Sequence, residues 1–158
     1  EKAYFAGPYM MTGKSILTRS SVLAQVESTG AINRADLKIA AIANSTSATF
    51  AQENTPEAEL TTTATSDEAV ALLIAGKVDA VLADMAVCKL AVLRNPESGL
   101  VTLKKPLTME PVGIAIKADD RQLQNLIDNF MDAFGKTGVL GQLRKKWFEN
   151  GDWVAALP

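Results

Sequence analysis

The stretch LKIAAIANSTSATF, residues 37–50, sets an apolar run directly before a cluster of polar side chains. The run from Leu37 to Ala43, with Lys38 as its one charged residue, has the length and composition of a buried β-strand. Hydroxyl and amide side chains then fill most of the positions from 44 to 49, and a helix-like segment covers residues 48–53. A strand, a polar turn and a helix in this order are the building unit of α/β sheets.

Short apolar runs and helix-like segments alternate along the rest of the chain, which predicts an α/β architecture with a mostly parallel central sheet flanked by helices. Strands are expected at residues 15–18, 37–43, 59–63 and 78–83, with weaker candidates at 3–6, 100–103 and 112–116. Thr65 and Glu68 form a capping box at a helix start, and another helix is expected from about Asp84 to Arg94. Two further helices are expected between residues 123 and 148, where glycines interrupt the apolar periodicity.

The composition excludes several classes of function. The 158 residues suffice for one compact domain, and 16 basic against 18 acidic residues give a net charge of -2. Because the chain lacks an excess of positive charge, we expect no nucleic acid partner. It also lacks histidine, the commonest general base and metal ligand, and we expect no metal and no cofactor. Cys88, the single cysteine, lies in an apolar helical pattern and is expected in the core.

Three hydroxyl residues, Ser45, Thr46 and Ser47, stand at the expected start of the helix after residues 37–43. The first N–H groups of a helix lack intrahelical partners, and the helix dipole favours an anion there. Uncharged hydroxyls at such a place suit a carboxylate better than a phosphate. The alternative is that Ser45 or Thr46 only caps the helix.

Asp84 follows directly on the apolar run 78–83. Open α/β sheets bind ligands in the crevice outside the carboxyl ends of their strands. If the strands 37–43 and 78–83 are neighbours, Asp84 faces the Ser45–Ser47 turn, and the pair would bind a zwitterion. The alternative is that Asp84 only caps the helix that follows it. A third candidate is the turn-rich, aromatic stretch 5–13, whose alternative is a plain surface turn.

Several short motifs follow one another in a fixed order along almost the whole chain. They are Phe-x-x-Pro-Tyr at 5–9, Ser-Thr-Ser at 45–47 with Phe50, Glu68-Ala69 before Ala71-Leu72, Gly-Lys-Val-Asp-Ala-Val at 76–81 with Asp84, Pro-Val-Gly-Ile-Ala-Ile-Lys at 111–117, and Gly138 with Lys-Trp-Phe at 146–148. In this order they resemble the polar-amino-acid family of bacterial extracellular (periplasmic) solute-binding proteins of amino acid ABC transporters. The resemblance implies a periplasmic-binding-protein-like fold of type II, with two α/β lobes joined by hinge strands.

The same resemblance implies a single partial solute-binding domain. Residues 1–11 would be a hinge strand, 12–109 lobe two, 110–117 the returning hinge strand and 118–158 the C-terminal helices, with most of lobe one lacking. Asn44 stands where the family commonly has a glycine. A site built from one lobe would bind a free amino acid weakly, unless a partner supplies the other half.

The resemblance also implies roles for the candidate residues. Thr46 would bind the α-carboxylate of the ligand, with Ser45 and Ser47 beside it, and Asp84 would accept a hydrogen bond from the α-ammonium. Tyr9, in the Phe-x-x-Pro-Tyr motif, is a further candidate ligand residue.

The function implied is non-enzymatic binding of an amino acid or similar small zwitterion, and delivery to a membrane permease. The protein would be periplasmic or extracellular, lipid-anchored or soluble, with its signal peptide removed. The apolar C-terminal helices are expected to fold back on lobe two, or to pair two copies into a homodimer through these helices or the hinge strands. Alternatives are a sensor domain of a larger receptor or a cyclohexadienyl-dehydratase-like enzyme, but the latter group is expected to carry a glutamate where this chain has Val87.

Overall fold

The computed structural model describes residues 3–156. The chain divides into two units, each described here by itself. Unit 2 comprises Gly13–Thr108, and unit 1 comprises the segments on either side of it, up to Thr12 and from Met109 onward. The assignment of residues 12–109 to lobe two of a two-lobed protein stays a prediction.

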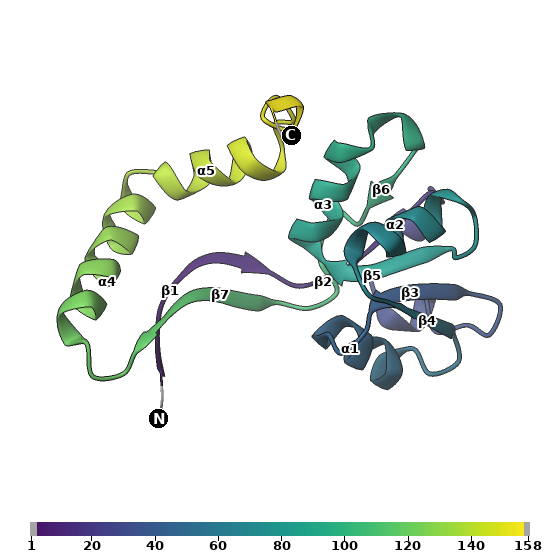
Figure 1. Ribbon diagram of the computed structural model, residues 1–158, viewed down its shortest axis with the longest axis horizontal. Helices are drawn as coiled ribbons and strands as arrows, with labels where there is room; N and C mark the ends of the chain where they lie inside the picture. Colours follow the sequence, from purple (N-terminus) through teal and green to yellow (C-terminus); the bar gives the residue numbers. More distant parts are fainter. Residues whose placement is uncertain (1–2, 157–158) are drawn as a thin grey trace. The chain divides into compact units, whose positions relative to one another are not determined.

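Unit 2 is built on a five-stranded sheet with the order β4-β3-β5-β2-β6 (Figure 1). Its strands are β2 (Lys14–Thr18), β3 (Lys38–Ile42), β4 (Glu59–Thr63), β5 (Ala80–Asp84) and β6 (Val101–Thr102). Strand β3 is parallel to β4 and β5, whereas β2 is antiparallel to both β5 and β6. All strands but β2 therefore run in one direction, which confirms the mostly parallel sheet predicted from the sequence.

Helices cover both faces of this sheet. They are α1 (Thr46–Asn54), α2 (Ser66–Ile74) and α3 (Met85–Arg94), with short 3-10 turns at Leu23–Gln25, Thr29–Ala31 and Pro96–Ser98. One core cluster joins Ala51 of α1 to Leu82 of β5, and a second joins Leu73 of α2 and Cys88 of α3 to Val81. Successive strand residues point to opposite faces of a sheet, so Val81 and Leu82 belong to different clusters. The unit therefore has three layers, with the sheet between two layers of helices.

The start of α2 shows how local sequence sets an element. The Thr65 hydroxyl accepts a hydrogen bond from the Glu68 backbone N–H at 3.2 Å, and the Glu68 carboxylate accepts one from the Ala64 N–H at 2.9 Å. The predicted capping box is thus confirmed. At the other end, Gly76 takes the left-handed conformation that ends the helix, with φ of 67°.

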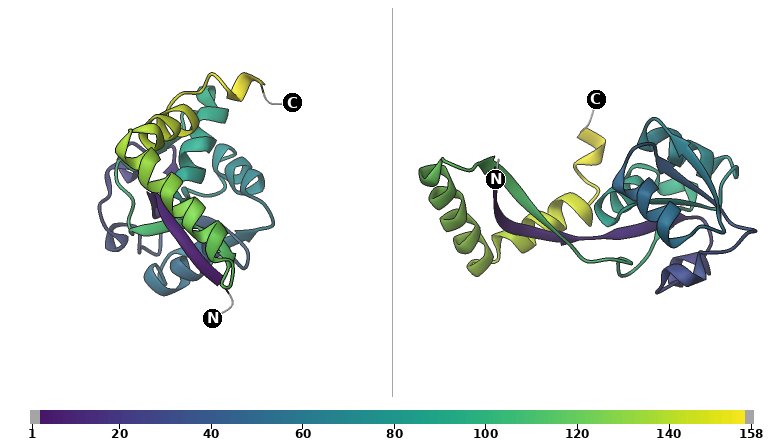
Figure 2. Two further views of the ribbon diagram at one scale, coloured as in Figure 1. Left: turned by 90° about the vertical axis from the view of Figure 1, so that its left-hand side faces the viewer. Right: turned by 90° about the horizontal axis from the view of Figure 1, so that it is seen from below.

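Unit 1 pairs β1 (Ala3–Thr12) with β7 (Glu110–Lys117) in an antiparallel ribbon (Figure 2). Helices α4 (Arg121–Lys136) and α5 (Val139–Phe148) and a 3-10 turn at Val154–Ala156 follow. Helix α4 contacts β1, and the Tyr4 hydroxyl donates a hydrogen bond to Asp128 at 3.1 Å. The predicted break between these helices is confirmed at Gly138, whose φ is 76°.

Some predicted boundaries were wrong. The stretch 5–13 is not a plain surface turn, because most of it belongs to β1, with a register shift between Ala6 and Met10. Strand β2 begins one residue earlier than predicted, at Lys14, because pairing with β5 outweighs the polarity of that side chain. Strand β5 begins later than predicted, at Ala80, and ends on Asp84.

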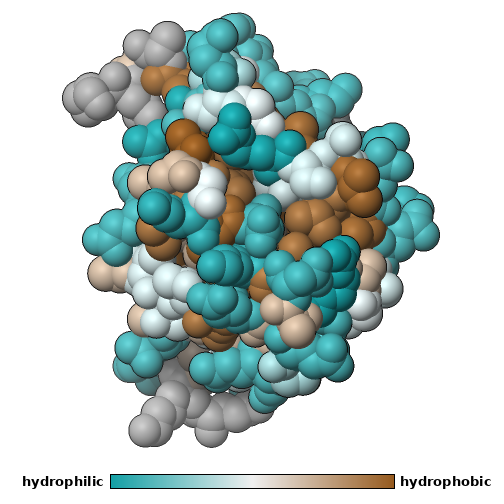
Figure 3. Space-filling view, turned by 90° about the vertical axis from the view of Figure 1, so that its right-hand side faces the viewer, coloured by the Kyte–Doolittle hydropathy of each residue, from teal (hydrophilic) through white to brown (hydrophobic). Residues whose placement is uncertain are grey.

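The surface carries polar and apolar side chains together. On the face in Figure 3, hydrophilic and hydrophobic residues are interspersed, as is usual for folded chains. None of the helices in the described residues is both long enough and apolar enough to cross a membrane.

Candidate functional site

The candidate site lies where the strand order of unit 2 reverses. From β3 the chain moves to β4 on one side, and then crosses to β5 on the other side of β3. Ile39 is in register with Ala80, so β3 and β5 are the parallel neighbours that the sequence argument required. Their carboxyl ends carry the Ser45–Ser47 turn and Asp84, at the kind of crevice where open α/β sheets bind ligands.

Ser45 is the N-cap of α1. Its hydroxyl accepts a hydrogen bond from the Ala48 N–H at 3.1 Å and donates one to the Ile42 carbonyl at 2.6 Å. The capping alternative is therefore confirmed for this residue, and both hydrogen bonds hold the turn in place. Asn44 precedes it with φ of 57°, a left-handed conformation that Asn tolerates better than most residues.

Asp84 occupies the N-cap position of α3, but its side chain makes no capping hydrogen bond. The carboxylate instead accepts a hydrogen bond from the Lys14 ammonium, with 2.6 Å between Nζ and Oδ1. The Asp84 side chain remains 41% exposed. The simple capping alternative for Asp84 was thus wrong, because the side chain turns toward β2.

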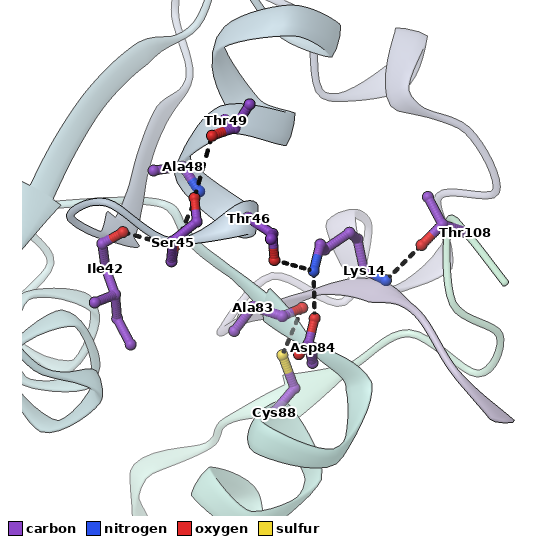
Figure 4. A network of polar contacts seen from close by, with 10 residues as sticks. All are labelled: Lys14, Ile42, Ser45, Thr46, Ala48, Thr49, Ala83, Asp84, Cys88 and Thr108. Atoms are coloured by element: carbon purple, nitrogen blue, oxygen red, sulfur yellow. Dashed lines mark hydrogen bonds and ion pairs between the residues drawn. The ribbon is translucent and has the colours of Figure 1, made fainter. Parts of the chain in front are cut away.

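Lys14 is the residue that sequence reasoning missed. It lies directly opposite Asp84 in the antiparallel pairing of β2 with β5, and only 3% of it is exposed. Its Nζ also donates a hydrogen bond to the Thr46 hydroxyl at 2.8 Å, so one ammonium joins the two predicted ligand residues (Figure 4). The strand prediction started one residue later and anticipated parallel neighbours, so nothing in it brought Lys14 to this edge.

The backbone of Lys14 is held as firmly as its side chain. Its N–H donates a hydrogen bond to the Thr108 hydroxyl at 2.8 Å, and its carbonyl accepts one from the Leu107 N–H at 2.6 Å. The ammonium is therefore placed by the sheet itself and by the chain segment that leaves the unit.

A pocket of about 130 Å³ opens beside these residues. Thr46, Ser47 and Asp84 are among its polar lining residues. Apolar side chains of α2, α3 and the sheet also line it, among them Ala69, Val70, Val87 and Ala91 from the two helices. Ser47 is only 7% exposed, and its hydroxyl has no hydrogen-bond partner within residues 3–156. A hydroxyl without a partner that lines a pocket is suited to hydrogen-bond a ligand.

Cys88 also lines this pocket and is 1% exposed, which confirms its predicted place in the core. Burial raises the pKa of its thiol to about 12. The thiol therefore stays protonated near neutral pH and unreactive. Tyr9, by contrast, lies half-buried on β1 of unit 1, and its contact with a ligand stays a prediction. Within the described residues, no group of three or more acidic or cysteine side chains could hold a metal.

No protein-family model matches the chain. It is 29% identical over 147 residues to the glutamine-binding protein GlnH of a Bacillus subtilis ABC transporter, covering 92% of this chain and 52% of that protein. Its structure matches an ancestral cationic amino acid solute-binding protein, AncCDT-1, with a TM-score of 0.80 and 31% identity over 93% of this chain and 62% of the other. Its homologues are amino-acid solute-binding proteins of ABC transporters.

A further structure with this fold is a binding component of an ABC transporter from Wolinella succinogenes in complex with lysine. It has a TM-score of 0.82 and 27% identity, over 97% of this chain and 66% of that one. The fold is thus that of type II periplasmic binding proteins, as the resemblance implied. The chain spans about half the length of GlnH and about three fifths of AncCDT-1.

Proposed function

We propose that this chain binds an amino acid or similar small zwitterion without catalysing a reaction. The observation that carries the proposal is the meeting of Thr46 and Asp84 at the switch point of the sheet, where both contact one ammonium at 2.8 and 2.6 Å. GlnH and AncCDT-1 are named as binding proteins for glutamine and for cationic amino acids, which supports the same class of ligand here.

The ligand carboxylate is proposed to lie at the N-terminus of α1. The first N–H groups of the helix point out of its end, and the helix dipole favours a negative charge there. The Ser47 hydroxyl, which has no hydrogen-bond partner in the described part of the chain, would donate a further hydrogen bond. Thr46 would contribute its hydroxyl, whereas Ser45 shapes the turn through its capping contacts.

The ligand ammonium is proposed to bind Asp84. The contact with Lys14 uses Oδ1, and the Asp84 side chain is 41% exposed, so Oδ2 is the oxygen proposed to accept from the ligand. The apolar part of the 130 Å³ pocket would accept a small aliphatic group. Tyr9 is proposed as a further ligand residue, as the family resemblance implies.

These contacts are proposed to form half of a complete site, because all but Tyr9 come from unit 2. The opposing half would contribute about 4 kcal/mol of binding free energy. Because about 1.4 kcal/mol corresponds to a tenfold change in affinity, its loss would raise a micromolar dissociation constant to the millimolar range. The chain would deliver its ligand to an ABC permease from a periplasmic or extracellular position, lipid-anchored or free. A homodimer through the C-terminal helices or hinge strands would cover the apolar residues of α4.

Two alternatives are favoured less. A second structure of AncCDT-1, 30% identical to this chain, is described as a precursor of cyclohexadienyl dehydratase. A dehydratase of that group is expected to use a glutamate carboxylate in its pocket. In this chain Val87 lines the pocket at that position. A sensor domain of a larger receptor would use the same site and differ only in what it is joined to.

Thermal-shift screening of amino acids tests the proposal. The wild-type chain should be stabilised by at least one amino acid at millimolar concentration, and Asp84→Ala should lose the shift. Asp67→Ala is the matched control, because Asp67 is an exposed carboxylate on α2 that forms an ion pair of 3.7 Å with Arg94. An undiminished shift in Asp84→Ala would exclude Asp84 as the ammonium acceptor.

A further inference from the structure

The Lys14 ammonium lies beside the carboxylate that is proposed to accept the ligand ammonium. It lies 2.6 Å from Oδ1 of Asp84 and 2.8 Å from the hydroxyl of Thr46, the two groups assigned to the ligand. Figure 4 shows the side chain reaching between them. The site of this structure thus includes a cation of the chain itself.

The surroundings of Lys14 oppose rotation of its side chain away from the site. Its side chain is 4% exposed, and the backbone on either side of its Cα is hydrogen-bonded to Thr108 and Leu107. It is also in register with Asp84 on the neighbouring strand. Side chains directly opposite each other in an antiparallel pair stay in contact, so the sheet maintains the ion pair.

We propose that Lys14 acts as a built-in substitute for the α-ammonium of the ligand and thereby determines specificity. The site would accept small 2-hydroxycarboxylates at least as well as the corresponding amino acids. This inference rests on the proposed carboxylate site at α1 and deepens it by naming the class of ligand.

The physical reason is charge. An α-ammonium on Oδ2 of Asp84 would share one carboxylate with the Lys14 ammonium, and two like charges at such close range repel each other. A 2-hydroxyl group can donate a hydrogen bond to Oδ2 without adding a second positive charge. The carboxylate of the hydroxy acid would still bind the N-terminus of α1 and the Ser47 hydroxyl. Its aliphatic part would still lie in the apolar pocket.

Lys14→Met is the decisive variant, because methionine keeps the apolar length of the side chain and removes the charge. Isothermal titration of the full chain with L-valine and with L-2-hydroxyisovalerate should show the hydroxy acid binding wild type at least as tightly. In Lys14→Met the order should reverse, with valine bound about tenfold more tightly, which is the low end of a charge-assisted hydrogen bond. Lys38→Met, the same change on exposed β3 residue Lys38, should keep the wild-type order.

The outcomes separate the two claims. If valine binds wild type tenfold more tightly than the hydroxy acid, the inference about Lys14 is overturned while the carboxylate site stands. An unchanged order in folded Lys14→Met overturns it too, and the wild-type comparison decides the matter if that variant does not fold. If neither compound shifts the amide resonances of Thr46 and Ser47 in wild type, the proposed function fails and the inference fails with it.

Discussion

The ion pair between Lys14 and Asp84 should contribute measurably to the stability of unit 2. A double-mutant cycle with Lys14→Met, Asp84→Asn and the double variant isolates that contribution. Each single change removes the pair, and Lys14→Met leaves the Asp84 carboxylate without its cation. The double variant has lost both charges, so it should be more stable than the two separate losses predict.

The expected coupling free energy follows from the distance between Nζ of Lys14 and Oδ1 of Asp84 and from the exposed fractions of the two side chains. Two unit charges 2.6 Å apart attract by roughly 6 kcal/mol at an effective dielectric constant of about 20, and by roughly 1.6 kcal/mol in water. Lys14 is buried, but the Asp84 side chain is 41% exposed, which lowers the attraction toward the aqueous value. We therefore expect a coupling free energy of about 2 kcal/mol, well below the cost of breaking a fully buried pair.

Urea unfolding followed by far-UV circular dichroism measures this coupling for all four proteins at pH 7. Asp67→Asn with Lys14→Met provides the control cycle, because Asp67 is in α2 and its carboxylate pairs with Arg94 at 3.7 Å. The control should give a coupling near zero. A coupling below about 0.5 kcal/mol for Lys14 and Asp84 would refute the claim that this contact is held in solution.

Three further predictions concern other parts of the chain. Thr65→Ala should lower the free energy of unfolding by about 1 kcal/mol in urea titrations, because it removes the α2 cap, whereas Thr65→Ser should not. The Cys88 pKa of about 12 lies above the 9.0 of an exposed thiol, so stability from this group is complete below pH 9 and is lost as pH rises toward 12. Wild type should therefore lose about 1 kcal/mol more than Cys88→Ala between pH 8 and pH 10, and equal losses would contradict the burial. If the half-exposed Leu126 and Phe130 of α4 pair two copies, light scattering should give a dimer that Phe130→Glu converts to a monomer; a wild-type monomer would exclude that pairing.

Much of the architecture could be predicted because local sequence agrees with tertiary structure. Strand β4 was predicted at 59–63 and is found there, and the start of α2 follows from the Thr65 cap. The parallel direction of β3 and β5 followed from helices alternating with apolar runs, whereas their pairing was only a condition of the site prediction. In these places the hydrophobic period, the caps and the packing all favour the same structure.

The site was only partly predictable. Thr46 and Asp84 could be proposed because each follows a predicted strand, and the carboxyl ends of parallel strands lie at the same edge of a sheet. Lys14 could not, since its place depends on β2 running against β5, and no local pattern specifies that pairing. The separate roles of neighbouring hydroxyls were also hidden, because only three-dimensional contacts distinguish Ser45, which is hydrogen-bonded within the turn, from Ser47, which lines the pocket.

The most direct test of the account is a ¹⁵N–¹H NMR titration of the full chain with amino acids and their 2-hydroxy analogues. The account predicts that the amide resonances of Thr46 and Ser47 move most, because the carboxylate binds at the start of α1. Saturation of both shifts at one millimolar dissociation constant would agree with a half-site. Unmoved resonances at Thr46 and Ser47, or larger changes elsewhere in the chain, would contradict it.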